Sequence, residues 1–200
     1  MSYINTNPLR YQVSEYDCGP TCILNAISLL HERETIPPEL IKHIWLFTMD
    51  AYNEQGEFAH KGTSEAMMVF LSQWLTEFGK TGKLSISAQH ICDEACHFGI
   101  GSPIIDTLKK GGVVVQRLWL DVRHYVLLTG MEDNRICVWD PYFYDGEFPD
   151  PGIEVVRNRP CLCNRIIEPR VLACEGSDYY NLGQIEDRES LLIFCPDDKN

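Results

Sequence analysis

The fold is decided by one stretch of this chain, Gln12-Val13-Ser14-Glu15-Tyr16-Asp17-Cys18-Gly19-Pro20-Thr21-Cys22. An apolar run from Ile23 to Leu30 follows it directly. Pro20 suits the first turn of a helix, where its missing N–H costs no hydrogen bond. Apolar residues then recur at helical spacing, at Ile23, Ala26, Ile27 and Leu30. The stretch therefore predicts a helix from about Pro20 to His31 with one buried face, and it places Cys18 just ahead of that helix.

Cys18 occupies a position that suits a reactive thiol. The unpaired N–H groups and the positive dipole end of a helix N-terminus favour an anion, and a thiolate is such an anion. Gln12 lies six residues upstream and can supply an amide N–H to the same place. The alternative is a small buried cysteine on a core helix, and this stretch by itself does not decide between the two.

Composition and charge narrow the classes of protein. The chain has 200 residues and a net charge of −12, and we expect a single domain over residues 1–200. The charge argues against nucleic acid or an anionic membrane as a partner. No stretch reaches the roughly 18 apolar residues of a membrane span, so we expect no membrane insertion. Because Met1-Ser2-Tyr3-Ile4-Asn5 lacks a secretory-signal pattern, the nine cysteines are expected to be mostly reduced thiols of a cytoplasmic protein.

The order of the expected elements indicates an α+β protein. Pro37-Pro38 is expected to open a second helix, Thr63 or Ser64 to cap a third that Gly79 ends in the left-handed conformation, and a fourth is expected from Pro103. The strand-like segments are Lys83–His90, Val113–Leu120, His124–Thr129, Arg135–Trp139, Ile153–Val156, Ile166-Ile167 and Ser190–Cys195. The helical part then takes about residues 1–112 and the β-sheet part about 113–200, with the N-terminal helices packed on an antiparallel sheet.

His124 and Asp140 complete a candidate catalytic group. His124 opens one strand, and Asp140 closes the next strand sixteen residues later. Strands joined by a short turn lie antiparallel, so the start of the first lies beside the end of the second. A carboxylate in that position can hold an imidazole in one tautomer, and the imidazole can draw the proton from Cys18. Taken singly, His124 is more often structural and Asp140 more often a turn residue, but together with Cys18 and Gln12 they favour a site.

These motifs resemble one family of enzymes. The Asp17-Cys18-Gly19-Pro20-Thr21-Cys22 run after Gln12, then Gly62-Thr63-Ser64, His124-Tyr125-Val126-Leu127-Leu128 and Asp140-Pro141 are similar to the bacteriocin-processing, double-glycine peptidases and their relatives. Those are papain-like cysteine peptidases, and the resemblance covers roughly residues 8 to 145. It implies the papain-like fold, with Cys18 as nucleophile, His124 as general base and Asp140 as orienting acid. Gln12 would be the oxyanion donor, together with the Cys18 backbone N–H.

The predicted function is that of a cysteine hydrolase, specifically a peptidase that cleaves a peptide amide bond through a thioester acyl-enzyme. The expected partner is a peptide or protein substrate, and the sequence indicates no oligomeric state. One alternative is an acyl or amide transferase with the same triad, in which an amine replaces water. Another is a non-catalytic peptide-binding module on the same fold, which the presence of Cys18, His124 and Asp140 disfavours.

Other residues raise two further questions. Cys92, Cys96 and His97, with Cys161 and Cys163, only partly match the spacing of paired zinc knuckles. A zinc-stabilised interaction domain is therefore the weakest alternative, and we expect neither metal nor cofactor. The acidic stretch from Asp140 to Asp150 also carries aromatic residues that either pack on the sheet or line a cleft, namely Tyr142, Phe143, Tyr144 and Phe148. A cleft of that kind favours peptides with basic or apolar residues over acidic ones.

Overall fold

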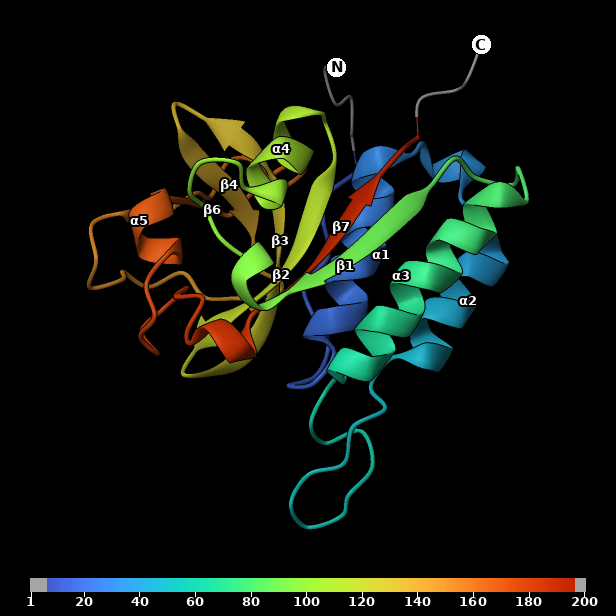
Figure 1. The fold of residues 1–200 in the computed structure, drawn as a ribbon, viewed down its shortest axis with the longest axis horizontal. Coiled ribbons are helices and arrows are strands. Elements are labelled where there is room, and N and C mark those ends of the chain that lie inside the picture. The colour runs from blue at the N-terminus through green and yellow to red at the C-terminus, as the bar shows by residue number, and fades with distance from the viewer. Residues whose placement is uncertain (1–6, 197–200) are drawn as a thin grey trace.

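A computed structural model describes residues 7–196 as helices packed on the two faces of one antiparallel sheet (Figure 1). The helices are α1 Cys18–Leu30, α2 Pro38–Phe47, α3 Glu65–Lys80, α4 Pro103–Lys109 and α5 Pro169–Leu172. The strands are β1 Ser87–Cys92, β2 Val113–Leu120, β3 Val122–Glu132, β4 Arg135–Trp139, β5 Ile153–Val155, β6 Arg165–Ile167 and β7 Glu189–Phe194. The expected α+β class, with N-terminal helices on an antiparallel sheet, is confirmed. Within residues 7–196, none of the helices is long and apolar enough to cross a membrane.

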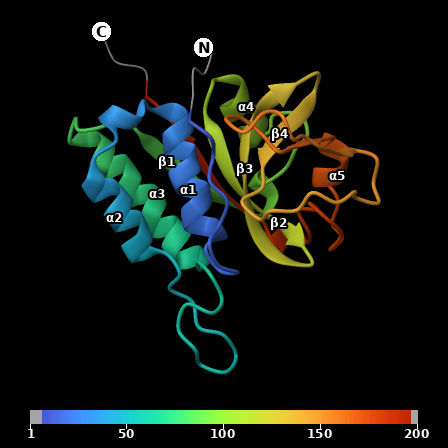
Figure 2. The same ribbon diagram turned by 180° about the vertical axis from the view of Figure 1, so that it is seen from behind.

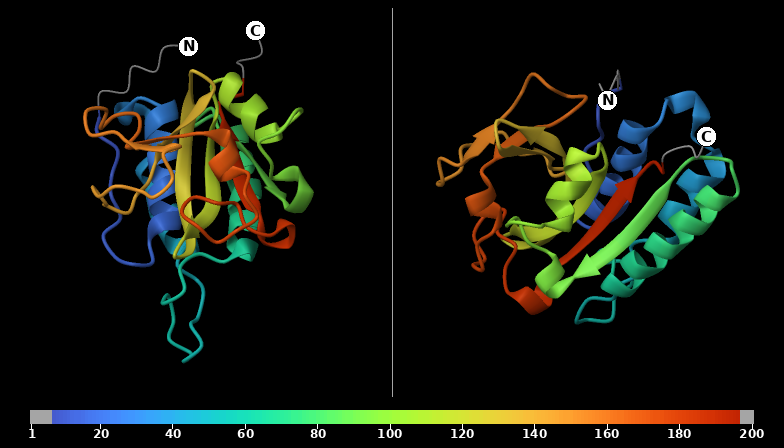
Figure 3. Two further views of the ribbon diagram at one scale, coloured as in Figure 1. Left: turned by 90° about the vertical axis from the view of Figure 1, so that its left-hand side faces the viewer. Right: turned by 45° about the horizontal axis from the view of Figure 1, so that its top comes forward.

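The sheet has seven strands in the order β1-β7-β2-β3-β4-β6-β5. The strands β2, β3 and β4 form a meander in its centre, as the sequence predicts. The last strand, β7, does not extend that meander but pairs with both β1 and β2. Figure 3 shows β7 lying beside β1, with α3 next to β1. The C-terminal strand thereby joins the first strand of the chain to the centre of the sheet.

Both faces of the sheet are buried. One core lies between the sheet and the helices α1, α2 and α3, which Figure 2 shows together on one side of the sheet. It contains Tyr125 and Leu127 of β3, whereas Val126 and Leu128 of the same strand enter a second core with α4 and α5. Successive residues of a strand point to opposite faces, so a strand buried on both sides reads as a continuous apolar run. That is the reason for the uninterrupted pattern of β3.

Several element boundaries differ from the expectation. Helix α1 begins at Cys18 rather than Pro20, so the thiol belongs to the first turn itself. Ser64 caps α3 as expected, because its side chain accepts a hydrogen bond from the Met67 N–H. The prediction that Gly79 ends α3 in the left-handed conformation is wrong, since the helix runs to Lys80. A Cβ at Gly79 would lie 1.9 Å from the Ile86 carbonyl oxygen, so this glycine allows the chain to pass close to the helix.

Candidate active site

Cys18 is placed by the first turn of α1 and by the loop before it. The thiol residue is buried, with 8% of its surface exposed. Asp17 precedes it, and its carboxylate accepts hydrogen bonds from the Val13 N–H at 2.9 Å and the Ser14 N–H at 2.6 Å. Burial of Asp17 opposes ionisation, but the hydrogen bonds from Ser14 and Val13 outweigh it and lower the pKa of the carboxyl. Asp17 therefore folds the loop 13–17 back against the start of the helix.

Gly19 allows α1 to approach its neighbours closely. A Cβ at this position would lie 2.6 Å from the Thr63 hydroxyl oxygen and 3.4 Å from the Met68 terminal methyl carbon. The Gly62-Thr63-Ser64 segment singled out in the sequence thus packs directly against the residue after Cys18. A larger residue at position 19 would push the helix start, and the thiol with it, away from its place.

His124 and Asp140 meet at one end of the β3–β4 pair, near the start of β3 and just after β4. The His124 Nε2 lies 2.7 Å from the Asp140 Oδ1, and both residues are buried, with 6% and 0% of their surfaces exposed. Because Nε2 is occupied by Asp140, Nδ1 is the ring nitrogen left for a second contact. The Cys18 thiol lies close enough to the His124 ring to raise the pKa of the imidazole. The structure therefore brings together the three residues that the sequence placed in one triad.

The positive charge of His124 and the negative charge of Asp140 stabilise each other. Burial of His124 disfavours its imidazolium, but the charge of Asp140 and the hydrogen bond that the ring donates to it, with a smaller contribution from Cys18, overcome this and raise the pKa of His124 to about 10. Burial of Asp140 opposes its ionisation in the same way. The His124 charge and the hydrogen bonds from His124 and Tyr180 prevail and lower the pKa of Asp140. The site is therefore built to hold a protonated imidazole beside an ionised carboxylate.

Three residues that sequence reasoning missed hold Asp140 from behind. The Tyr180 hydroxyl donates to Asp140 Oδ2 at 2.7 Å, and the Arg165 Nε donates to the Tyr180 oxygen at 3.1 Å. Asn164 bonds the Asp140 backbone at both ends, accepting from its N–H at 2.8 Å and donating to its C=O at 2.7 Å. Tyr180 and Arg165 are almost fully buried, and Tyr180 has a φ of 65°, which bulky residues rarely adopt. The sequence contains only a weak signal for these three supports of Asp140, because they lie beyond the motifs that were recognised in it.

Gln12 reaches the site through its backbone. Its N–H donates to the Pro141 carbonyl at 2.9 Å, so the N-terminal segment runs alongside the end of β4. The Asn25 side chain and the Trp139 indole both bond Arg10, which fixes this segment to α1 and β4. The Gln12 Nε2 donates to the Ser14 carbonyl at 2.7 Å, and among residues 7–196 its buried Oε1 has no hydrogen-bond partner. The amide thus bonds its own loop, and its role as oxyanion donor stays a prediction.

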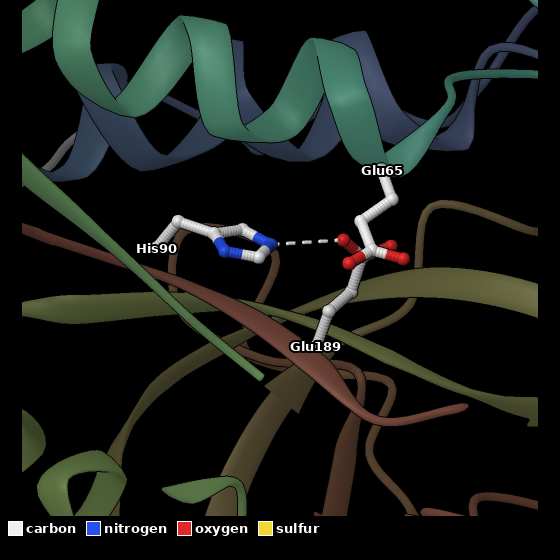
Figure 4. Close-up of side chains that lie close together, drawn as sticks. All are labelled: Glu65, His90 and Glu189. Atoms are coloured by element: carbon white, nitrogen blue, oxygen red, sulfur yellow. Dashed lines mark hydrogen bonds and ion pairs between the residues drawn. The ribbon is translucent and has the colours of Figure 1, made fainter. Parts of the chain in front are cut away.

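A separate cluster has the spacing of metal ligands. Within the described chain, Glu65, His90 and Glu189 form the group whose ligand atoms lie within 4.8 Å of one another (Figure 4). Glu189 is buried, and its carboxylate pairs with Arg117 at 2.6 Å and His90 at 3.1 Å and accepts from the Tyr125 hydroxyl. These donors from β1, β2 and β3 compensate the buried carboxylate of β7 without a metal ion.

The residues considered for a zinc site make other contacts. The Cys92 sulfur donates to Asp93 at 3.2 Å, and the Cys96 sulfur donates to the Ile91 carbonyl at 3.3 Å. The His97 Nδ1 accepts from the Gly99 N–H at 3.1 Å. Cys163 contacts a cysteine of β4. In the part of the chain that the structure describes, these side chains do not belong to the one group of three that has metal-ligand spacing.

No family model and no curated protein matches the sequence. Solved structures do match the fold. One is the peptidase domain of Streptococcus mutans ComA, with 16% identity, a TM-score of 0.38, and coverage of 94% of this chain and 98% of that one. Another is the peptidase domain of Streptococcus ComA, a bi-functional ABC transporter involved in a quorum-sensing pathway. It has 16% identity, a TM-score of 0.40, and coverage of 94% and 96%. These likenesses concern the fold, and the function has to be derived from the side chains.

Proposed function

We propose that this chain is a cysteine peptidase with Cys18 as nucleophile, His124 as acid–base catalyst and Asp140 as the orienting carboxylate. The observation that carries the proposal is the buried chain of contacts from Cys18 through His124 to Asp140. A histidine and an aspartate that merely stabilised the core would not need a thiol beside the imidazole as well. A nucleophile, a base within hydrogen-bond reach and a group orienting that base are the parts that covalent catalysis requires.

The reaction follows from these contacts. The Cys18 thiolate attacks the carbonyl carbon of the substrate amide, and its negative charge moves to the carbonyl oxygen. When the C–N bond breaks, the His124 imidazolium gives its proton to the leaving amine, and a thioester on Cys18 remains. A water molecule then loses a proton to the neutral His124 as it attacks the thioester. The C–S bond breaks, the acid product leaves, and Cys18 is again a thiolate beside the imidazolium. Asp140 stays ionised throughout and stabilises the imidazolium whenever it forms.

The oxyanion is stabilised by N–H groups at the start of α1. The Cys18 backbone N–H belongs to the first turn, where N–H groups point away from the helix and find no carbonyl four residues back. Gln12 is the second donor in this proposal. Its Nε2 carries two hydrogens, and the bond to Ser14 uses one of them. The second hydrogen is available for a substrate oxygen that enters beside the helix N-terminus.

Exposed aromatic side chains next to the triad indicate a peptide with apolar residues. Tyr11 packs on Trp139 at a ring-centre distance of 5.0 Å and on Phe143 at 5.3 Å. Tyr142 and Phe143 follow Asp140 after one proline and keep 39% and 64% of their surfaces exposed. Aromatic surfaces of this kind bind extended peptides through apolar contact.

The other side chains of the stretch from Asp140 to Asp150 have different roles. Phe148 packs on Tyr144, Tyr179 and Tyr180, so it belongs to the support behind Asp140 rather than to a cleft. Asp150 pairs with Arg170 at 2.8 Å, which reduces the negative field that the sequence alone suggests. Apolar contact is therefore the stronger determinant of the substrate, and charge the weaker one.

The test is labelling with a thiol-directed epoxide or acyl probe, followed by peptide mapping. We expect one modified residue, Cys18, and a rate that falls roughly ten- to a hundredfold in His124→Ala because the thiolate loses its imidazolium partner. Cys92 is the internal control, since Asp93 holds its hydrogen and raises its pKa. Equal labelling of Cys18 and Cys92 would contradict the proposal. Adding a primary amine to a turnover assay then separates hydrolysis from transfer, because a transferase forms the amide of that amine.

A further inference from the structure

A second pair of thiols lies outside the triad. Cys137 is on β4, and Cys163 lies in the loop just before β6. Both are buried, with 3% and 1% of their surfaces exposed, and they form a small core cluster with Ile166. The two thiols lie close enough to shift the pKa of each other. Packing alone does not require two thiols here, because an alanine or valine would fill the same apolar cluster.

A cation lies next to one of the two sulfurs. Arg159 makes a side-chain hydrogen bond to Cys163, and the Cys163 N–H bonds the Arg159 carbonyl at 3.1 Å. The hydrogen bond from Cys137 and the charge of Arg159 outweigh burial and lower the pKa of Cys163. The hydrogen bond to Cys163 and burial raise the pKa of Cys137. The two thiols therefore differ, and Cys163 loses its proton more readily than Cys137.

The buried pair lies beneath a partly exposed arginine side chain. The Arg159 side chain is 38% exposed, so the sulfur that it contacts lies directly beneath the surface. Glu132 pairs with the outer edge of the same guanidinium and fixes its position. A low-pKa sulfur next to a surface arginine, with a second thiol in contact, is the arrangement in which peroxide oxidation ends as a disulfide.

We propose that Cys137 and Cys163 form an oxidisable dithiol that a hydroperoxide converts to an intramolecular disulfide. The Cys163 thiolate attacks one peroxide oxygen, the O–O bond breaks, and the second oxygen leaves as water after taking a proton. Cys163 is then a sulfenic acid. The Cys137 sulfur attacks the Cys163 sulfur, the S–O bond breaks, and its hydroxyl leaves as a second water with the Cys137 proton. The two thiols lose two electrons, and the peroxide gains them.

The disulfide would lie next to the support of Asp140. Asn164 follows Cys163 and holds both ends of the Asp140 backbone. Cys137 is three residues before Asp140 on the same chain. The cross-link therefore bridges the two segments between which Asp140 is held, and it closes a loop of residues 137–163 around that residue.

The experiment uses the full chain carrying Cys18→Ala, so that the triad thiol cannot react and failure of the proposed function does not affect the result. The protein is treated with hydrogen peroxide, unfolded in iodoacetamide and digested without reduction. We expect a cross-linked pair of peptides containing Cys137 and Cys163, lighter by two hydrogen atoms and separated by dithiothreitol. Cys161→Ser should retain the cross-link, and Cys137→Ser should lose it.

A surface variant keeps the proposal testable if the buried substitutions fail to fold. Arg159→Gln should slow formation of the cross-link roughly three- to tenfold, because the thiolate loses its cation. Arg170→Gln is the matched control, since Arg170 pairs with Asp150 and Glu168 and should leave the rate unchanged. A cross-link between Cys163 and Cys161 would overturn the proposal. So would full alkylation of Cys137 and Cys163 under conditions that oxidise Cys92.

Discussion

The substitution Tyr180→Phe tests whether the C-terminal part of the chain holds the triad. It removes one oxygen atom and keeps the shape of a side chain that is completely buried. That oxygen donates to Asp140 at 2.7 Å and accepts from the Arg165 Nε at 3.1 Å. The variant leaves a buried carboxylate oxygen without its donor and a buried guanidinium N–H without its acceptor. Arg165 retains its hydrogen bonds to the Asn164 and Tyr144 carbonyls, so its buried charge stays partly compensated.

The magnitude follows from these two lost contacts. A hydrogen bond to a charged group contributes about 1.5–3 kcal/mol, and an unsatisfied buried donor costs about 1–3 kcal/mol, so we expect a loss of about 2.5–6 kcal/mol at pH 7. The loss depends on pH. The folded state lowers the pKa of Asp140, so its carboxylate stabilises the fold above the unfolded pKa of about 4. That contribution disappears as the pH falls through the folded pKa, and the difference between the two proteins should shrink below about pH 4.

The assay is urea unfolding followed by tryptophan fluorescence, at several pH values from 7 downward. Tyr179→Phe is the matched control, because the neighbouring tyrosine is half-buried and packs with its ring on Phe148. We expect it to change the unfolding free energy by less than about 0.5 kcal/mol. An equal loss in both variants, or a loss for Tyr180→Phe that does not change between pH 7 and the acid range, would refute the reasoning.

Three further outcomes are expected. The imidazolium of His124 stabilises the fold fully below its unfolded pKa of about 6.5, and this contribution is lost as the pH rises to about 10. The difference in urea midpoint between the wild type and His124→Gln should therefore shrink over that pH window. A difference that stays constant contradicts this prediction. Gln12→Ala should lower turnover roughly ten- to a thousandfold, because one oxyanion donor is lost, and should leave the alkylation rate of Cys18 unchanged. If turnover and the alkylation rate fall together, Gln12 has a structural role instead. Peptides with apolar or basic residues beside the scissile bond should give a higher kcat/KM than acidic ones in a peptide library, with an apolar preference that added salt does not remove. A library in which acidic peptides are cleaved best counts against this substrate class.

Much of the fold and the triad could be predicted from local patterns. The Cys18 to Leu30 stretch contains a helix because its apolar residues recur every three or four positions behind a proline. The pairing of His124 with Asp140 follows from two strands and a short turn, because antiparallel hairpin geometry leaves one arrangement of their ends. Both inferences need only contacts between segments that are near in sequence.

The rest was decided by the tertiary structure. Strand β7 lies between β1 and β2, and nothing in its sequence specifies which strands it will pair with. Gly79 looked like a helix end, but its role comes from the approach of Ile86 across a turn. Tyr180 carries no motif, and its bond to Asp140 exists because two segments forty residues apart fold together. Periodicity records which face of an element is buried, but it does not record which distant residue meets that face. The sequence alone therefore determined the helix, the hairpin and the meeting of His124 with Asp140, and only the packed chain determined what holds Asp140 in place.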